Sequence, residues 1–180
     1  MIVSEVTARS VWPVSTGEAA EYLGLPGDWT SSTLEMLVRQ ATEAVERATL
    51  RATTQRTLDV YLAPPFGPRI ALPYPPVQSI DGLYAINDDT GETQLDLNDW
   101  NQLGEEPRKL WPKSGVWPYC DRLRIRCVCG YTSADDVPEQ LKLDILRVVA
   151  AQWESRSQRI HVDARPLIDE DLCRQLERND

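Results

Sequence analysis

Few residues of this chain could serve in catalysis or metal binding, and they are not clustered in the sequence. The only histidine, His161, lies in a polar stretch, and a Ser–His–Asp or Cys–His nucleophile site would have to be built on it. Cys127 and Cys129 form a C-x-C pair on one face of an expected strand, which is a weak metal signal. Cys120 and Cys173 could complete a four-thiolate zinc site only through long-range folding. We expect instead free, buried thiols that act as small hydrophobic side chains.

Phosphate and carboxylate chemistry is also poorly supported. Lys113-Ser114 has no upstream glycines, so it is not part of a phosphate-binding G-x-x-x-x-G-K-[ST] loop. Asp88-Asp89 and Asp135-Asp136 are acidic pairs, but both lie in expected turns, where aspartate forms local hydrogen bonds. We therefore predict a protein that is not an enzyme and that uses no cofactor and no metal. A small enzyme built on the paired cysteines or on the histidine is the alternative.

Composition predicts one domain, or one domain with an extension, because the chain has 180 residues of which 42% are hydrophobic. The formal net charge is −9, which argues against a protein that grips nucleic acid through a basic patch. An acidic surface along which DNA slides without sticking remains compatible with this charge. No signal-peptide pattern is visible, and no run approaches the roughly 18 apolar residues of a membrane span. We expect a protein that is used in a cytoplasm or released from one by lysis.

Three helices must carry most of the core. They are expected over about 16–24, 32–50 and 138–156. Ser32 and Glu35 have the spacing of a capping box at the start of the second helix. The third helix has apolar residues over an arc of roughly 200° instead of a single stripe. It is therefore either a central core helix or a helix covered on one side by a neighbouring subunit. The residues predicted to pack against that subunit are Leu141, Ile145, Val148, Val149 and Trp153.

A β-rich segment over about 53–129 separates the second and third helices, so the fold class is α+β: two or three main helices in a bundle, an inserted β-rich segment and an extended C-terminal tail. Residues 77–87 and 92–97 read as a hairpin, and residues 98–118 as irregular. In the last expected strand, Arg122, Arg124 and Arg126 share one face. This row is compatible with nucleic-acid binding, but the acidic chain favours a solvated face or a ladder paired with carboxylates.

The organisation of the chain resembles that of the head–tail connector (adaptor) proteins of tailed bacteriophages and gene transfer agents, and the resemblance covers about residues 15–156. The most specific motifs are LPYPPVQSI at 72–80 and GYTSADDVPEQLK at 130–142. Further matching stretches are 46–49, 55–62, 117–118 and 152–156. The resemblance implies a connector domain over 1–156 and a tail over 157–180 that matches no family pattern.

What the resemblance implies is a structural virion protein of the neck, made in the host cytoplasm. Such proteins form a homo-oligomeric ring, commonly of twelve copies, beneath the portal protein. They extend the channel through which double-stranded DNA passes without specific binding, and they present a platform to the next neck or tail protein. Their C-terminal segments reach the portal. The tail of this chain could fray or become ordered on such a partner, and its predicted portal anchors are Pro166, Leu167, Ile168, Leu172 and Leu176. A tail terminator or another neck component is the alternative.

Overall fold

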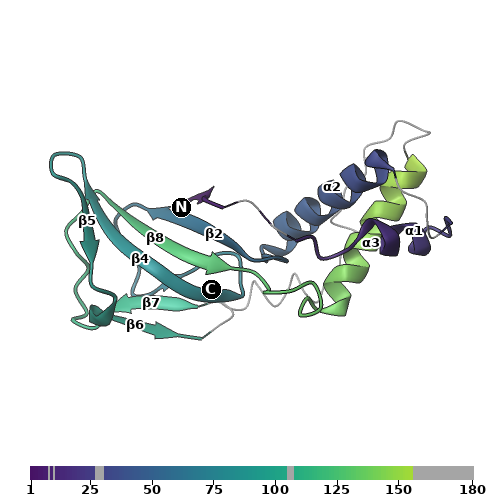
Figure 1. The fold of residues 1–180 in the computed structure, drawn as a ribbon. Coiled ribbons are helices and arrows are strands. Elements are labelled where there is room, and N and C mark those ends of the chain that lie inside the picture. The colour runs from purple at the N-terminus through teal and green to yellow at the C-terminus, as the bar shows by residue number, and fades with distance from the viewer. Residues whose placement is uncertain (8, 10, 27–30, 105–107, 156–180) are drawn as a thin grey trace. The chain divides into compact units, whose positions relative to one another are not determined.

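The computed structural model describes residues 1–155 apart from 8, 10, 27–30 and 105–107. Within these residues the chain forms three α-helices, eight β-strands and one short 3-10 helix (Figure 1). In chain order they are β1 (Ile2–Glu5), α1 (Thr16–Tyr22), α2 (Ser32–Thr49), β2 (Arg56–Leu62), β3 (Ile70–Ala71), β4 (Val77–Asn87), β5 (Gly91–Leu95), η1 (Leu97–Asp99), β6 (Trp100–Leu103), β7 (Lys109–Pro112), β8 (Arg122–Cys129) and α3 (Glu139–Ser155).

Two compact units share these elements, and each is built from two separate stretches of chain. The β unit comprises Met1–Ser10 and Gln55–Gly130, and the helical unit comprises Val11–Thr54 and Tyr131–Asp180. The β unit therefore holds every strand, and the helical unit holds the three α-helices. None of the described helices is both long enough and apolar enough to cross a membrane.

Serine side chains fix the starts of the first two helices. At α1, the Ser15 hydroxyl accepts a hydrogen bond from the Glu18 N–H at 3.1 Å, and the Ser15 N–H donates to the Glu18 carboxylate at 2.7 Å. This reciprocal pair is a capping box, which satisfies two otherwise unpaired N–H groups. At α2, Ser31 is the cap and accepts from the Thr33 N–H at 3.2 Å. The predicted box from Ser32 is therefore wrong: Ser31, one residue earlier, has the extended backbone that a cap requires, and Leu34 three positions after it cannot complete a box.

The core of the helical unit lies between α2 and α3, which pack against each other and run in opposite directions (Figure 1). The α1 helix contacts both of them. Each fully buried aliphatic side chain contributes about 1.5–3 kcal/mol through removal of its surface from water. The buried residues of this core are Val14, Ala19, Ala20, Leu34, Val38, Ala41, Val45, Val137, Leu141, Ile145, Val148 and Val149.

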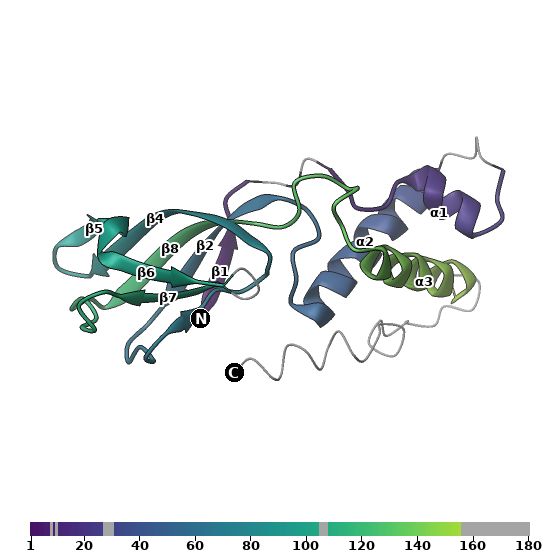
Figure 2. The same ribbon diagram turned by 90° about the horizontal axis from the view of Figure 1, so that it is seen from below.

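Two antiparallel sheets make up the β unit. The larger sheet has the strand order β1-β2-β8-β4-β5, and the smaller has the order β3-β7-β6 (Figures 1 and 2). The central strand β8 alternates strictly: its apolar face, from Leu123 to Cys129, is fully buried, while its arginines lie on the opposite face. Leu58 and Val60 of β2 pair with Cys127 and Ile125, so the two strands bury one continuous apolar face.

The predicted α+β class is confirmed, with three helices and antiparallel sheets. The prediction of an irregular stretch over 98–118 is wrong in part, because β6 and β7 pair there. The Trp117 ring lies 5.1 Å from Phe66 and 5.4 Å from Trp100, and these aromatic contacts fix the remaining loop. The strand β1 was not predicted. The predicted tail, 157–180, lies outside the described residues, and the domain boundary at 156 stays a prediction.

Candidate interaction surfaces

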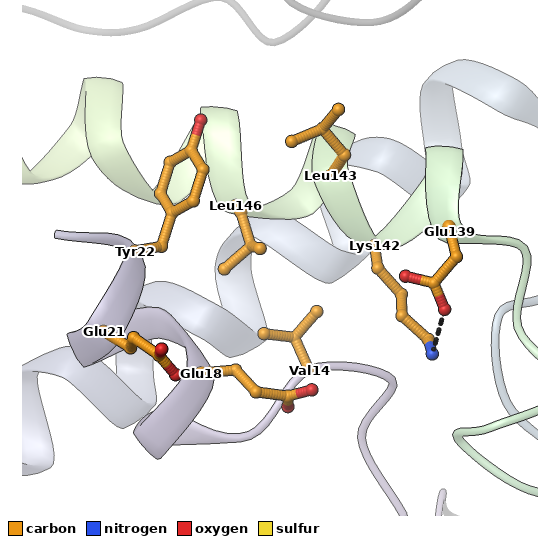
Figure 3. Close-up of a pocket in the computed structure, with 8 residues that line it drawn as sticks. All are labelled: Val14, Glu18, Glu21, Tyr22, Glu139, Lys142, Leu143 and Leu146. Atoms are coloured by element: carbon orange, nitrogen blue, oxygen red, sulfur yellow. Dashed lines mark hydrogen bonds and ion pairs between the residues drawn. The ribbon is translucent and has the colours of Figure 1, made fainter. Parts of the chain in front are cut away.

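The helical unit carries an open groove of ≈500 Å³ between α1, together with Val14 just before it, and the N-terminal half of α3. We call it the acidic groove. Figure 3 shows Val14 and Leu146 facing one another across it, with Glu18 and Glu21 on one side and Lys142 with Glu139 on the other. Its lining residues are Val14, Glu18, Glu21, Tyr22, Glu139, Lys142, Leu143 and Leu146.

The charged groups of the acidic groove differ in how far they are already engaged. The Glu18 carboxylate accepts from both the N–H and the hydroxyl of Ser15 at 2.7 Å. Burial alone would raise the pKa of Glu18, but these hydrogen bonds and the Lys142 charge lower it, so the group is ionised. Lys142 donates to Glu139 at 2.9 Å, and this hydrogen bond raises the pKa of Lys142. The carboxylate of Glu21 is exposed. Three carboxylates and one ammonium therefore leave the rim negative.

This arrangement suits binding and does not suit covalent catalysis. A nucleophilic lysine needs a pKa lowered by burial or by a neighbouring cation, whereas the pKa of Lys142 is raised. The leucine and valine side chains give the groove an apolar base, and the carboxylates give it a rim that attracts cations. A peptide segment with both apolar and basic side chains is complementary to this surface in polarity and charge.

The arginines of β8 form ion pairs with carboxylates of β2, of β5 and of the turn between β4 and β5. Arg126 donates to both oxygens of Asp59 at 2.8 Å, and Arg124 donates to the same carboxylate at 3.3 Å. Arg124 also pairs with Glu92, and Arg122 pairs with Asp88 at 3.1 Å. Of the two alternatives left open for this row, a solvated face and a carboxylate-paired ladder, the structure supports the ladder for Arg124 and Arg126 and a solvated pair for Arg122. Arg124, 14% exposed, and Arg126, 33% exposed, are therefore largely engaged within the sheet, whereas Arg122 is 54% exposed in a solvated pair.

A glycine allows an aromatic ring to lie under this ladder. The Arg124 guanidinium lies 4.1 Å from the centre of the Tyr84 ring. A Cβ on Gly82 would come within 2.6 Å of that ring, so a side chain at this position would displace it.

The Arg126 hydrogen bonds lower the pKa of Asp59, since they stabilise the ionised carboxylate.

The cysteines behave as core residues in the part of the chain that the structure describes. Cys127 and Cys129 are fully buried with their sulfurs 3.5 Å apart, and Cys120 is 6% exposed. The hydrogen bond with the Cys129 sulfur and burial together raise the pKa of the Cys127 thiol, which makes it a poor nucleophile. No cluster of His, Cys, Asp and Glu suited to a metal occurs among the described residues. Cys173 and His161 lie outside them.

The predicted interaction residues fall into two groups. The predicted portal anchors Pro166, Leu167, Ile168, Leu172 and Leu176 lie outside the described residues. Five residues of α3 are predicted to pack against another subunit. Within the single chain Trp153 is half-buried, and the other four are 0% exposed: Leu141, Ile145, Val148 and Val149.

These four side chains pack against α2 and α1 of the same chain, so their surface is already used. Subunit packing through α3 stays a prediction, and on this geometry it would use Trp153 with the half-buried Leu143 and Leu146. The acidic groove was not predicted, although the apolar arc of α3 is wider than burial against one helix requires and so indicated a second apolar surface. Leu143 and Leu146 widen that arc beyond a single core stripe, and they line the groove.

Comparison with known proteins identifies the fold. A chain in the neck of the native gene transfer agent particle, solved with C12 symmetry, matches with a TM-score of 0.76 and 22% identity over 97% of this chain and 94% of that chain. The fold is one found in gene transfer agent necks. A chain of the native gene transfer agent virion matches with the same values, and a neck chain of the empty particle with C6 symmetry matches with a TM-score of 0.73 and 21% identity, covering 86% of this chain and 84% of that chain. No family model and no curated protein matches the sequence.

Proposed function

We propose that this chain is a structural virion protein of the head–tail neck, where its copies form a ring between the portal and the tail. The observation that carries the proposal is the fold correspondence with a gene transfer agent neck chain over 97% of one chain and 94% of the other. Because both chains correspond almost in full, the likeness extends beyond one shared module to the whole architecture. A purely structural role agrees with the buried thiols and the protonated lysine described above.

A ring is supported by the symmetry of the similar particles. Their necks have C6 and C12 symmetry, and cyclic symmetry requires two different complementary surfaces on each subunit. The half-buried Leu143, Leu146 and Trp153 offer apolar area for one of these surfaces. We propose a ring of twelve copies as the most economical match to C12 symmetry.

The charge distribution supports passage of DNA through the ring without specific binding. The chain has a formal net charge of −9, and phosphate binding needs accessible basic groups. The three arginines of β8 form the most concentrated basic row of the β unit, and each is paired with at least one carboxylate. A DNA phosphate would have to displace these carboxylates to bind there.

The portal contact is proposed for the tail. This otherwise charged segment contains five apolar residues, a composition that suits a segment that becomes ordered on a partner. They are Pro166, Leu167, Ile168, Leu172 and Leu176. The next neck or tail protein would then contact the ring on the side away from the portal. The function proposed here is therefore that of an adaptor between two other rings.

The experiment is light scattering of the purified chain, with and without its cognate portal protein, followed by negative-stain imaging. We expect a ring, either alone or on the portal. Truncation after Arg156 should leave a folded chain that no longer joins the portal. A full-length pair gives a sharper comparison: Leu167→Asp with Ile168→Asp should abolish portal binding, while Ile160→Asp with Val162→Asp should preserve it. A monomer that ignores the portal, or a truncated chain that still binds it, would contradict the proposal.

A further inference from the structure

The acidic groove is unusual in combining an apolar base with a negative rim on one small face. Leu143 and Leu146 are half-buried, and Tyr22 is 46% exposed, so apolar surface remains in contact with water. Glu18 is directed into its capping box and Glu139 is paired with Lys142. Glu21 is left exposed at the rim and available to a cation from a docked segment.

One segment of the chain has the complementary composition. Residues 156–165, RSQRIHVDAR, contain three arginines and one aspartate, although the whole chain is strongly acidic. Ile160 and Val162 lie between the basic residues and can supply the apolar contacts. The following residues, 166–180, are acidic in balance and would be repelled by the same rim.

The length of this segment matches the distance that it would have to cover. The α3 helix ends at Ser155, and Leu143 lies 12 positions earlier along it. At a rise of about 1.5 Å per residue, this separation is roughly 18 Å along the helix axis. An extended chain covers about 3.3 Å per residue, so about six residues lead back to Leu143. Residues near 159–162 would thus arrive beside Leu143 and Leu146.

We propose that residues 156–165 fold back along α3 and dock in the acidic groove of their own chain. Ile160 and Val162 cover the apolar base, and the flanking arginines lie at the carboxylate rim. Docking within one chain is favoured over docking on another copy because a short connection gives an effective concentration of the order of millimolar. The inference needs no portal, but it bears on the proposed ring: a docked segment covers Leu143 and Leu146, so a subunit surface that used these two leucines would have to displace it.

The test uses a labelled synthetic peptide of residues 156–165 and the full-length chain, with binding followed by fluorescence anisotropy. The first receptor is the full chain with Arg156→Glu, Arg159→Glu and Arg165→Glu, in which residues 156–165 should no longer occupy the groove. We call this variant the released chain. We expect saturable binding that weakens as salt is added. We expect at least tenfold weaker apparent binding to the wild-type chain, because its own segment competes for the groove.

Matched variants locate the binding surface. Glu21→Lys, introduced into the released chain, should weaken peptide binding about tenfold. Glu43→Lys on α2 makes the same charge change at an exposed position of the helical unit outside the groove, and it should leave binding within about twofold. Circular dichroism establishes that both variants keep their helices. A peptide of residues 166–180 should not bind.

Three results would overturn the proposal. The first is the absence of peptide binding to the released chain. The second is an equal effect of Glu21→Lys and Glu43→Lys, which would indicate general attraction to an acidic protein. The third is equal binding to the wild-type and released chains, which would mean that the own segment does not occupy the groove. If light scattering then showed association that Glu21→Lys abolishes, the occupant would be the segment of a second copy.

Discussion

The ladder on β8 predicts that Asp59→Asn destabilises the β unit strongly. The Asp59 side chain is 6% exposed and accepts three hydrogen bonds from two guanidinium groups. The asparagine side chain has nearly the same shape, so packing changes little. It lacks the negative charge, however, and its NH₂ group would face an arginine N–H, where two donors meet.

The magnitude follows from the number of bonds and the exposure of the partners. Each hydrogen bond to a charged group contributes about 1.5–3 kcal/mol, and asparagine preserves at most one of the two bonds from Arg126. Arg126 is 33% exposed and can regain water, while Arg124 is 14% exposed and keeps Glu92. We therefore expect a net loss of about 2–4 kcal/mol. Asp88→Asn is the matched control: Asp88 is 75% exposed with one arginine partner at 3.1 Å, and such pairs contribute about 0–1 kcal/mol.

The assay is urea unfolding followed by tryptophan fluorescence in a background with Trp12→Phe, Trp29→Phe and Trp153→Phe, so that the signal comes from Trp100, Trp111 and Trp117 of the β unit. Far-ultraviolet circular dichroism follows the helices separately, since two units need not unfold together. With a slope of about 2 kcal/mol per molar urea, the middle of the usual range, the midpoint should fall by about 1–2 M for Asp59→Asn. Equal, small shifts for the two variants would refute the reasoning, because the ladder would then be an ordinary solvated surface.

The pH dependence provides a second check with a defined sign. The hydrogen bonds from Arg126 lower the pKa of Asp59 in the folded chain, while the unfolded value is about 3.9. The unfolded state therefore binds the proton more readily, and the contribution of Asp59 to stability is complete above about pH 5. It is lost as the pH falls through the lowered folded pKa. The stability difference between the wild type and Asp59→Asn should shrink over this acidic range.

The remaining predictions concern other contacts. Gly82→Ala should cost about 1–3 kcal/mol in the β unit, since its Cβ would lie 2.6 Å from the Tyr84 ring, whereas Gly67→Ala, with its nearest neighbour at 3.7 Å, should be nearly neutral in the same urea titration. Ile145→Ala should destabilise the helical unit by about 2–5 kcal/mol because the side chain is fully buried, and the adjacent Leu146→Ala should cost clearly less, as measured by thermal unfolding at 222 nm. Ser15→Ala should cost about 0.5–2 kcal/mol by removing the cap of α1, and an unchanged melting temperature would contradict the capping box.

Local sequence patterns predicted those helices and strands whose own apolar periodicity identifies both the element and its buried face. The three helices were placed within about two residues, because their apolar residues recur at the helical period. The alternation along β8 predicted both its buried face and its arginine ladder. The hairpin of β4 and β5 was also predicted, since an acidic turn with Gly91 joins two strand-like runs.

Elements defined by distant partners could not be predicted in this way. The strand β1 has four mostly exposed residues, and only its pairing with β2 makes it a strand. β6 and β7 are equally short and are recognisable only as a pair. The wide apolar arc of α3 left two explanations open, because periodicity cannot distinguish a helix of the same chain from a neighbouring subunit. The structure shows that α1 covers part of this arc, and the groove between them is visible only in three dimensions.

The order of the chain has a consequence for synthesis on the ribosome. The apolar stripe of α2 emerges early, but α3, which buries it, follows only after all of the β unit. The β unit, by contrast, is complete at Gly130. We therefore expect the nascent chain to close its sheets first, while Leu34, Val38 and Val45 stay uncovered until translation has passed α3. During that interval the stripe is an apolar surface that chaperones can bind.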